Sequence, residues 1–267
     1  MTLPVHRFAS LEAVPGLGHA FSTRSGPGGR PLAISFRSCP EPDVVTTHRE
    51  AVAREAGAPL DRLVFGEQVH EAGVAVVSDE DAGRGARVPW TAVPRVDALV
   101  TREPGLFLAG LSAACYLARN GHACMVFLAD PRGRTCALVH SSWRSTVLGI
   151  CHAAVGTMAS VFGTRARDLA AAISPSIGPC CFEVKEDFVA QAMPAFHAHP
   201  ELLVSREGRT TFDLWEAVRI QLLELGLSPD RIESPRLCTR CRAELFFSHR
   251  REGPLGGRNL SVIGWVA

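Results

Sequence analysis

The sequence predicts an α+β fold in which strands dominate. Short apolar runs of strand length recur along the chain and are bounded by glycine, proline and polar turns. Stretches with apolar residues at helical spacing interrupt them irregularly, without the regular alternation of strand and helix that marks a parallel α/β sheet. No internal repeat, low-complexity tract or obvious linker divides the 267 residues. We therefore expect a single domain over residues 1–267.

The first helix and the strands follow from local patterns. Residues 44–56 carry apolar residues at helical spacing, and Thr46 or Thr47 can cap the start of this helix. Residues 97–111 are expected to form a hairpin that turns at Glu103-Pro104-Gly105. Other apolar runs predict strands at 63–65, 74–77, 125–128, 136–139, 246–248 and 260–263.

Three further helices are expected in the second half of the chain. The pattern changes directly after Val139, and residues 145–161 carry apolar residues on a broad face, as a core-packed helix does. A short helix is expected over 188–192. The last covers 214–225, with Asp213 as its N-cap and Gly226 as its stop.

The composition excludes several classes of function. The formal charge is +1 and shows no footprint of a nucleic-acid binder. Lys185 is the only lysine, so a Walker-type phosphate loop is absent. The first six residues lack the features of a signal peptide, and no apolar stretch is long enough to span a bilayer. We expect a cytoplasmic protein with reduced thiols and no membrane or nucleic-acid partner.

The strongest local geometry is the junction between a strand and a helix after Val139. His140 is expected at the end of the strand, with Ser141 or Ser142 capping the helix and Arg144 in or near its first turn. A helix N-terminus with an adjacent arginine suits an anion, and a metal ligand beside it suits phosphorolysis or hydrolysis. The alternative is a well-capped helix with a buried histidine and a surface arginine.

Three separated fragments each place a nitrogen or sulfur ligand at the end of a strand-like run. They contribute His70, Cys115 and His140. Two imidazoles and one thiolate form a zinc ligand set that leaves a fourth position open, as catalytic zinc sites do. The spacing alone does not establish such a site. Cys124 competes with Cys115 for a role as thiolate ligand.

Two further cysteine motifs are predicted to have no metal-binding or redox role. Cys238 and Cys241 have the spacing of a metal knuckle, but no second motif of that spacing completes a zinc site. We therefore interpret the pair as incidental. Cys180 and Cys181 follow a Gly-Pro turn and are expected to pack there.

A set of short motifs along nearly the whole chain resembles one known family. It includes Phe21-Ser22-Thr23-Arg24, Gln68-Val69-His70, Asp97-Ala98-Leu99-Val100-Thr101, Pro104-Gly105, Leu128-Ala129-Asp130-Pro131, His140 with Trp143-Arg144, Ile177 to Val184, Phe212-Asp213-Leu214, Cys238-Thr239, Phe246 to Arg251 and Gly257-Arg258. By their number and order the chain is identified as a member of the family called YfiH-like, laccase-domain or polyphenol oxidase proteins.

The resemblance implies a four-layer α/β/β/α fold and a catalytic zinc site made by His70, Cys115 and His140. It also implies phosphorolysis of purine nucleosides such as adenosine, inosine or methylthioadenosine, which gives the base and a ribose 1-phosphate, and deamination of adenosine. Phosphate is expected to meet Arg144, with Arg24 or Arg258 as further candidates. Copper oxidation of phenols is disfavoured because a multicopper cluster needs many paired histidines. A thiolate–imidazole site would still take up adventitious Cu²⁺.

The chain departs from the family pattern near the expected site. Ala114 stands where the family usually has an aspartate, and Ser142 and Ser145 stand where it usually has glycines. A lost carboxylate changes the surroundings of a metal, and a replaced glycine matters where a loop needs positive φ. Two alternatives therefore stay open. One is a Cys–His hydrolase that edits peptidoglycan precursors, and the other is a degenerate member that binds a nucleoside without turnover.

Overall fold

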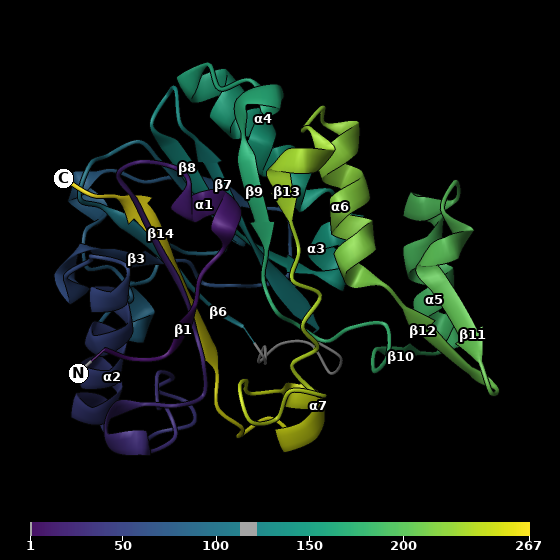
Figure 1. Cartoon of the computed structure of the whole chain (residues 1–267), viewed down its shortest axis with the longest axis horizontal. Coiled ribbons are helices and arrows are strands. Elements are labelled where there is room, and N and C mark those ends of the chain that lie inside the picture. Colours follow the sequence, from purple (N-terminus) through teal and green to yellow (C-terminus); the bar gives the residue numbers. More distant parts are fainter. Residues whose placement is uncertain (1, 113–121) are drawn as a thin grey trace.

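Two large β-sheets pack face to face, with helices on the two outer sides (Figure 1). The computed structural model describes residues 2–112 and 122–267. The five-stranded sheet has the order β1 (Val5–His6), β2 (Leu17–Ser22), β14 (Asn259–Trp265), β6 (Phe107–Ser112), β3 (Leu63–Phe65). The six-stranded sheet has the order β13 (Ile232–Glu233), β9 (Ala170–Ile173), β7 (Ala123–Asp130), β8 (Thr135–Ser142), β5 (Ala98–Thr101), β4 (Val74–Val76).

Three apolar cores define four layers. Phe127 of β7 and Ile263 of β14 belong to the core between the two sheets. Helix α2 (Pro42–Glu55) covers the outer face of the five-stranded sheet through Val52. Helices α3 (Trp143–Val147), α4 (Ile150–Phe162) and α6 (Leu214–Glu224) cover the outer face of the six-stranded sheet. The predicted α+β class and the α/β/β/α sandwich are therefore confirmed. None of the helices in the described part of the chain is long and apolar enough to cross a membrane.

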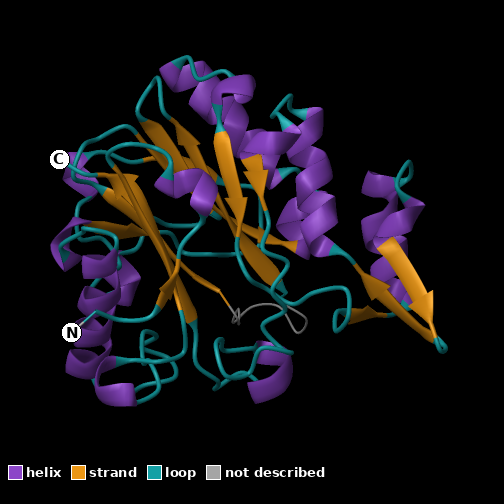
Figure 2. Cartoon of the chain, viewed as in Figure 1, coloured by secondary structure: helices purple, strands orange, loops and turns teal. Residues whose placement is uncertain are grey.

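A small third sheet extends from the side of the molecule that carries α6 (Figure 2). It consists of β10 (Glu183–Val184), β12 (Arg209–Phe212) and β11 (Leu203–Arg206), and α5 (Glu186–Ala192) lies against it. Phe188 of α5 packs on Trp143 of α3, with ring centroids 4.8 Å apart. Two one-turn helices, α1 (Ala9–Glu12) and α7 (His249–Glu252), complete the regular structure named here.

The expected hairpin over 97–111 is wrong. Strands β5 and β6 belong to different sheets, and the turn at Glu103-Pro104-Gly105 carries the chain from one sheet to the other. β5 pairs with β8 and β4, while β6 pairs with β14 and β3, so both edges of each strand are taken by other partners. A short turn can connect β5 in one sheet to β6 in the other, because packed sheets lie about 10 Å apart.

Most other predicted elements are confirmed, with three corrections. The expected helix 145–161 is divided at Gly149, whose φ of 76° belongs to the left-handed region. Residues 246–248 form no strand. Glu41, not Thr46 or Thr47, precedes the first turn of α2. The boundaries of α6 agree, because the Asp213 side chain accepts a hydrogen bond from the Glu216 N–H at 3.0 Å.

Candidate functional site

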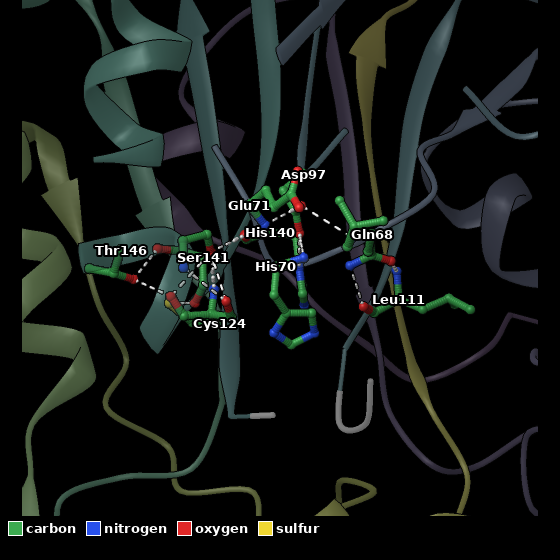
Figure 3. A network of polar contacts seen from close by, with 12 residues as sticks. Gln68, His70, Glu71, Asp97, Leu111, Cys124, His140, Ser141 and Thr146 are labelled. Atoms are coloured by element: carbon green, nitrogen blue, oxygen red, sulfur yellow. Dashed lines mark hydrogen bonds and ion pairs between the residues drawn. The ribbon is translucent and has the colours of Figure 1, made fainter. Parts of the chain in front are cut away.

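His140 lies near the C-terminal end of β8, two residues before Ser142, and is oriented by Asp97 (Figure 3). Its Nδ1 is 2.8 Å from Oδ1 of Asp97, and its backbone N–H donates to the Asp97 carbonyl at 2.7 Å. Asp97 directly precedes β5, the strand paired with β8. With Nδ1 held by a carboxylate, Nε2 is the nitrogen left for a ligand, and this carboxylate–imidazole arrangement is the usual support of a metal-binding histidine.

The same carboxylate shapes the loop that carries His70. The N–H groups of Val69, His70 and Glu71 donate to the Asp97 carboxylate at 3.1, 3.0 and 2.9 Å. His70 has a φ of 65°, a conformation that residues other than glycine rarely adopt. Three backbone donors on one anion stabilise that conformation. Asp97 thus positions both histidines.

The imidazole rings of His70 and His140 are buried and in contact, and the pKa values around them are shifted. Their ring centroids are 4.9 Å apart and nearly perpendicular, at 81°. Burial, and after it the neighbouring His140, lower the pKa of His70 to about 3. Burial alone would raise the pKa of Asp97, but hydrogen bonds from His140 and from the loop N–H groups hold it below its usual value. The site therefore holds a neutral His70 and a charged Asp97.

The unpartnered ring of His70 indicates whether a metal ion fits this site. Both of its ring nitrogens are buried and have no hydrogen-bond partner among the described residues. Leaving buried polar atoms unpaired costs free energy, so such atoms need an explanation. A metal ion accepts the lone pair of a neutral imidazole, and zinc commonly takes nitrogen ligands at about 2.0–2.1 Å. His70 and His140 therefore fit a zinc ion, while the expected third ligand, Cys115, lies outside the described residues.

The structure rejects Cys124 as the alternative thiolate. In the antiparallel pair of β7 and β8, Met125 lies opposite His140, and Cys124 lies opposite Ser141. Side chains alternate between the two faces of a sheet. Cys124 accordingly belongs to the core under the helices, with its Sγ 3.7 Å from the Ser141 carbonyl oxygen (Figure 3). Burial raises the pKa of its thiol, which makes it an inert core cysteine.

Ser142 and Ser145, the serines expected to depart from the family pattern, cap α3 reciprocally. The Ser142 Oγ accepts from the Ser145 N–H at 3.1 Å, and the Ser145 Oγ accepts from the Ser142 N–H at 2.8 Å. Ser142 has a φ of −73°, so no glycine is required there. Two N–H groups at the start of this five-residue helix already have partners, because the Ser145 N–H donates to Ser142 Oγ and the Trp143 N–H donates to the His122 carbonyl at 3.1 Å.

A cleft of about 550 Å³ opens beside His70. Arg144 lies on its rim with an exposed side chain that extends over the Trp143 ring, 4.7 Å from its centroid. No hydrogen bond or ion pair joins the Arg144 side chain to another residue in the described ranges. The cleft is lined by Val69, His70, Glu71, Trp143, Arg144, Val147, Leu148 and Gln191.

The other two candidate arginines contact different parts of the chain. Arg24 donates to the Ala243 carbonyl at 2.6 Å and to Glu252 at 3.2 Å. Arg258 is 4% exposed and donates to the carbonyls of Pro254, Gly256 and Gly257. Neither lines the cleft beside His70. Among the three, Arg144 is the one that lines the cleft beside His70.

The sequence predicts neither the role of Asp97 nor the grouping of the four cysteines. For Asp97 the available signal is an aspartate directly before a strand that is mostly apolar. The sequence pattern also predicts no metal-binding role for Cys238 and Cys241. The structure corrects this, because these two residues meet Cys180 and Cys181 in a group that could hold a metal ion.

The four layers and the buried pair of histidines define a class of α/β/β/α proteins with a candidate metal centre at the end of two adjacent strands. Comparison with known families assigns the chain within that class. It belongs to the family described as "Multi-copper polyphenol oxidoreductase laccase", whose model matches residues 18–266.

Named relatives and a solved structure agree with this assignment. The chain is 36% identical over 226 residues to "Purine nucleoside phosphorylase YlmD" of Geobacillus stearothermophilus, covering 82% of this chain and 78% of that protein. It is 33% identical over 218 residues to "Adenosine deaminase RL5" of an unknown prokaryotic organism, covering 80% and 79%. The crystal structure of YlmD from Geobacillus stearothermophilus superposes with a TM-score of 0.84 at 31% identity, covering 95% and 93%.

Proposed function

We propose that this chain is a zinc-dependent purine nucleoside phosphorylase that also deaminates adenosine. The observation that carries the proposal is the pair of buried imidazoles beside an open cleft, with both ring nitrogens of His70 unpartnered among the described residues. The names of the relatives supply the substrate class, since they include a phosphorylase and a deaminase of purine nucleosides.

His70, His140 and Cys115 would hold the zinc ion. When bound, Zn²⁺ supplies Lewis-acid polarisation of a substrate atom and lowers the pKa of water. Residues of this chain orient the proposed histidine ligands. Asp97 fixes the tautomer and direction of the His140 ring through Nδ1, and it holds the His70 loop through three N–H groups. His70 stays neutral at physiological pH, because its pKa is lowered to about 3.

Arg144 is the proposed phosphate-binding residue. Its guanidinium is exposed on the rim of the cleft that His70 lines, and it can donate two parallel hydrogen bonds to a phosphate. In phosphorolysis an oxygen of dihydrogen phosphate bonds to C1′ of the ribose and loses its proton, while the bond from C1′ to the purine nitrogen breaks. That nitrogen takes the electron pair of the broken bond and a proton, so the products are the free base and ribose 1-phosphate. The Trp143 side of the cleft offers an apolar wall for the nucleoside.

Copper oxidation of phenols, which the family description suggests, fits this chain less well. All ten histidines fall in the described ranges, and there His70 and His140 are the one pair of histidines whose rings are in contact. A multicopper cluster needs several such pairs. We therefore propose nucleoside chemistry at this centre.

The proposal is tested by product analysis of adenosine incubated with the zinc-loaded protein, with and without phosphate. We expect adenine and ribose 1-phosphate only when phosphate is present, and inosine in both buffers. His140→Ala should abolish all three products, because it removes a proposed ligand. His152→Ala is the matched control, since His152 is exposed on α4, and it should behave as the unaltered protein does. Absence of all three products from the zinc-loaded, unaltered protein would reject the proposal.

A pair of alanine substitutions tests which cysteine is the ligand. Cys115→Ala should lose one equivalent of zinc and the phosphorylase activity. Cys124→Ala should keep both, because its thiol lies on the opposite face of the sheet from His140. The buried void left in Cys124→Ala should lower the free energy of unfolding by about 1 kcal/mol. Metal analysis and activity assays provide the comparison, and a Cys124→Ala protein without zinc in this site would contradict the assignment.

A further inference from the structure

Four cysteines from two distant segments converge away from the histidine pair. Cys180 and Cys181 lie in a turn after β9, and Cys238 and Cys241 lie in the loop before α7. Their sulfur atoms all lie within 4.8 Å of one another. The Sγ of Cys241 is 3.7 Å from that of Cys180 and 3.5 Å from that of Cys181.

The sulfur separations suit four ligands of one ion. A disulfide brings two sulfurs to about 2.05 Å, well below the recorded separations. A tetrahedral zinc with Zn–S bonds of about 2.3 Å places its four sulfurs roughly 3.8 Å apart. An iron–sulfur cluster would spread its cysteines over several iron atoms, whereas these four sulfurs surround one small volume.

Hydrogen bonds hold the segment of Cys180 and Cys181 against the loop of Cys238 and Cys241. The Thr239 N–H donates to the Ser176 carbonyl at 2.9 Å, which joins the loop to the segment before the Cys180 turn. The Gly178 N–H donates to the Cys238 Sγ at 3.3 Å, and Arg240 approaches the Cys181 Sγ at 3.6 Å. Hydrogen-bond donors and a positive charge at the sulfurs stabilise thiolates, the form that binds a metal.

We propose that Cys180, Cys181, Cys238 and Cys241 bind a structural zinc ion that is separate from the proposed catalytic one. Four thiolates fill a tetrahedral zinc completely, and such closed sites are structural. The ion would lock the loop before α7 to the turn after β9. That loop is also held from α7, where Arg251 donates to the carbonyls of Thr239 and Arg240 at 2.8 and 3.0 Å.

The first experiment measures metal in a protein whose histidine site has been removed. In the His70→Ala/His140→Ala variant we expect one equivalent of zinc, and cobalt substitution should give the visible bands of a tetrahedral tetrathiolate site. Adding Cys241→Ser should remove that equivalent and shift the cobalt spectrum. Adding Cys39→Ser instead is the matched control and should leave both unchanged, because Cys39 is outside the cluster. A double variant without bound metal, or with iron in place of zinc, would overturn the proposal.

Alkylation of the cysteines tests the proposed zinc site even if the Cys241→Ser variant does not fold. Cys180 and Cys241 are exposed in the structure and should react quickly with iodoacetamide when no metal protects them. We expect slow labelling of both in the zinc-loaded His70→Ala/His140→Ala protein and fast labelling after a chelator, read by peptide mass spectrometry. Fast labelling before chelation, or a disulfide between these cysteines in the purified protein, would overturn the proposal. Neither readout depends on phosphorylase activity, so failure here is distinguishable from failure of the proposed function.

Discussion

Asp97→Asn is expected to lower both zinc affinity and kcat/KM for adenosine phosphorolysis by about 10- to 100-fold, the usual effect of removing a residue that orients a metal ligand. The Asp97 carboxylate accepts hydrogen bonds from His140 Nδ1 and from three loop N–H groups. An asparagine has one acceptor oxygen, and its NH₂ group would face a donor. The His70 loop and the His140 ring therefore both lose their fixed directions.

Two measurements separate this positioning role from general destabilisation. Zinc titration of Asp97→Asn should show weakened binding, and excess zinc should recover part of the lost activity. Asp79→Asn makes the same chemical change at an exposed ion pair with Arg62, and such pairs contribute little. It should leave zinc affinity and activity unchanged. If Asp97→Asn bound zinc as tightly as the unaltered protein, Asp97 would not position the metal ligands.

Phe127→Ala is expected to lower the free energy of unfolding by about 3–5 kcal/mol, a large part of the 5–15 kcal/mol that a typical protein has. Phe127 is 0% exposed on β7, in the core between the two sheets. Its ring packs against Phe8, with centroids 5.1 Å apart. Removing the ring leaves a cavity in the layer that joins the sheets, and urea denaturation measures the loss.

The control for Phe127→Ala is a substitution at an exposed position of the outer helical layer. Val161 is 53% exposed at the end of α4, and Val161→Ala should change the free energy of unfolding by no more than about 0.5 kcal/mol. A similarly small change for Phe127→Ala would mean that the two sheets do not pack through this residue. The slope of the urea transition should be compared between variants, because it reports whether unfolding remains two-state.

Local features of this protein were predictable because they depend on neighbouring residues. The strands 63–65 and 260–263 follow from apolar runs, and the limits of α6 follow from a capping aspartate and a terminating glycine. His140 at a strand end followed by a serine cap is of the same kind, since the cap closes within four residues. The turn between β7 and β8 also joins neighbouring strands, as a hairpin does.

The pairing of strands was decided by tertiary structure. Residues 97–111 have the pattern of a hairpin, yet β5 and β6 enter different sheets because each finds other partners on both edges. An apolar run specifies that a strand is buried but not which strand lies beside it. The face that each side chain occupies follows from that pairing, and this is why only the structure separates Cys124 from the His140 side.

The sequence by itself determined the family, the types of the candidate ligands and the local ends of helices and strands, all of which follow from residue identity and short-range spacing. Only the tertiary structure decided that Asp97 joins His140 to the His70 loop and that Cys181 meets Cys241, sixty residues away in the chain. The physical reason is that hydrogen bonds and metal ligation act over a few ångströms in space. Chain folding alone sets those distances.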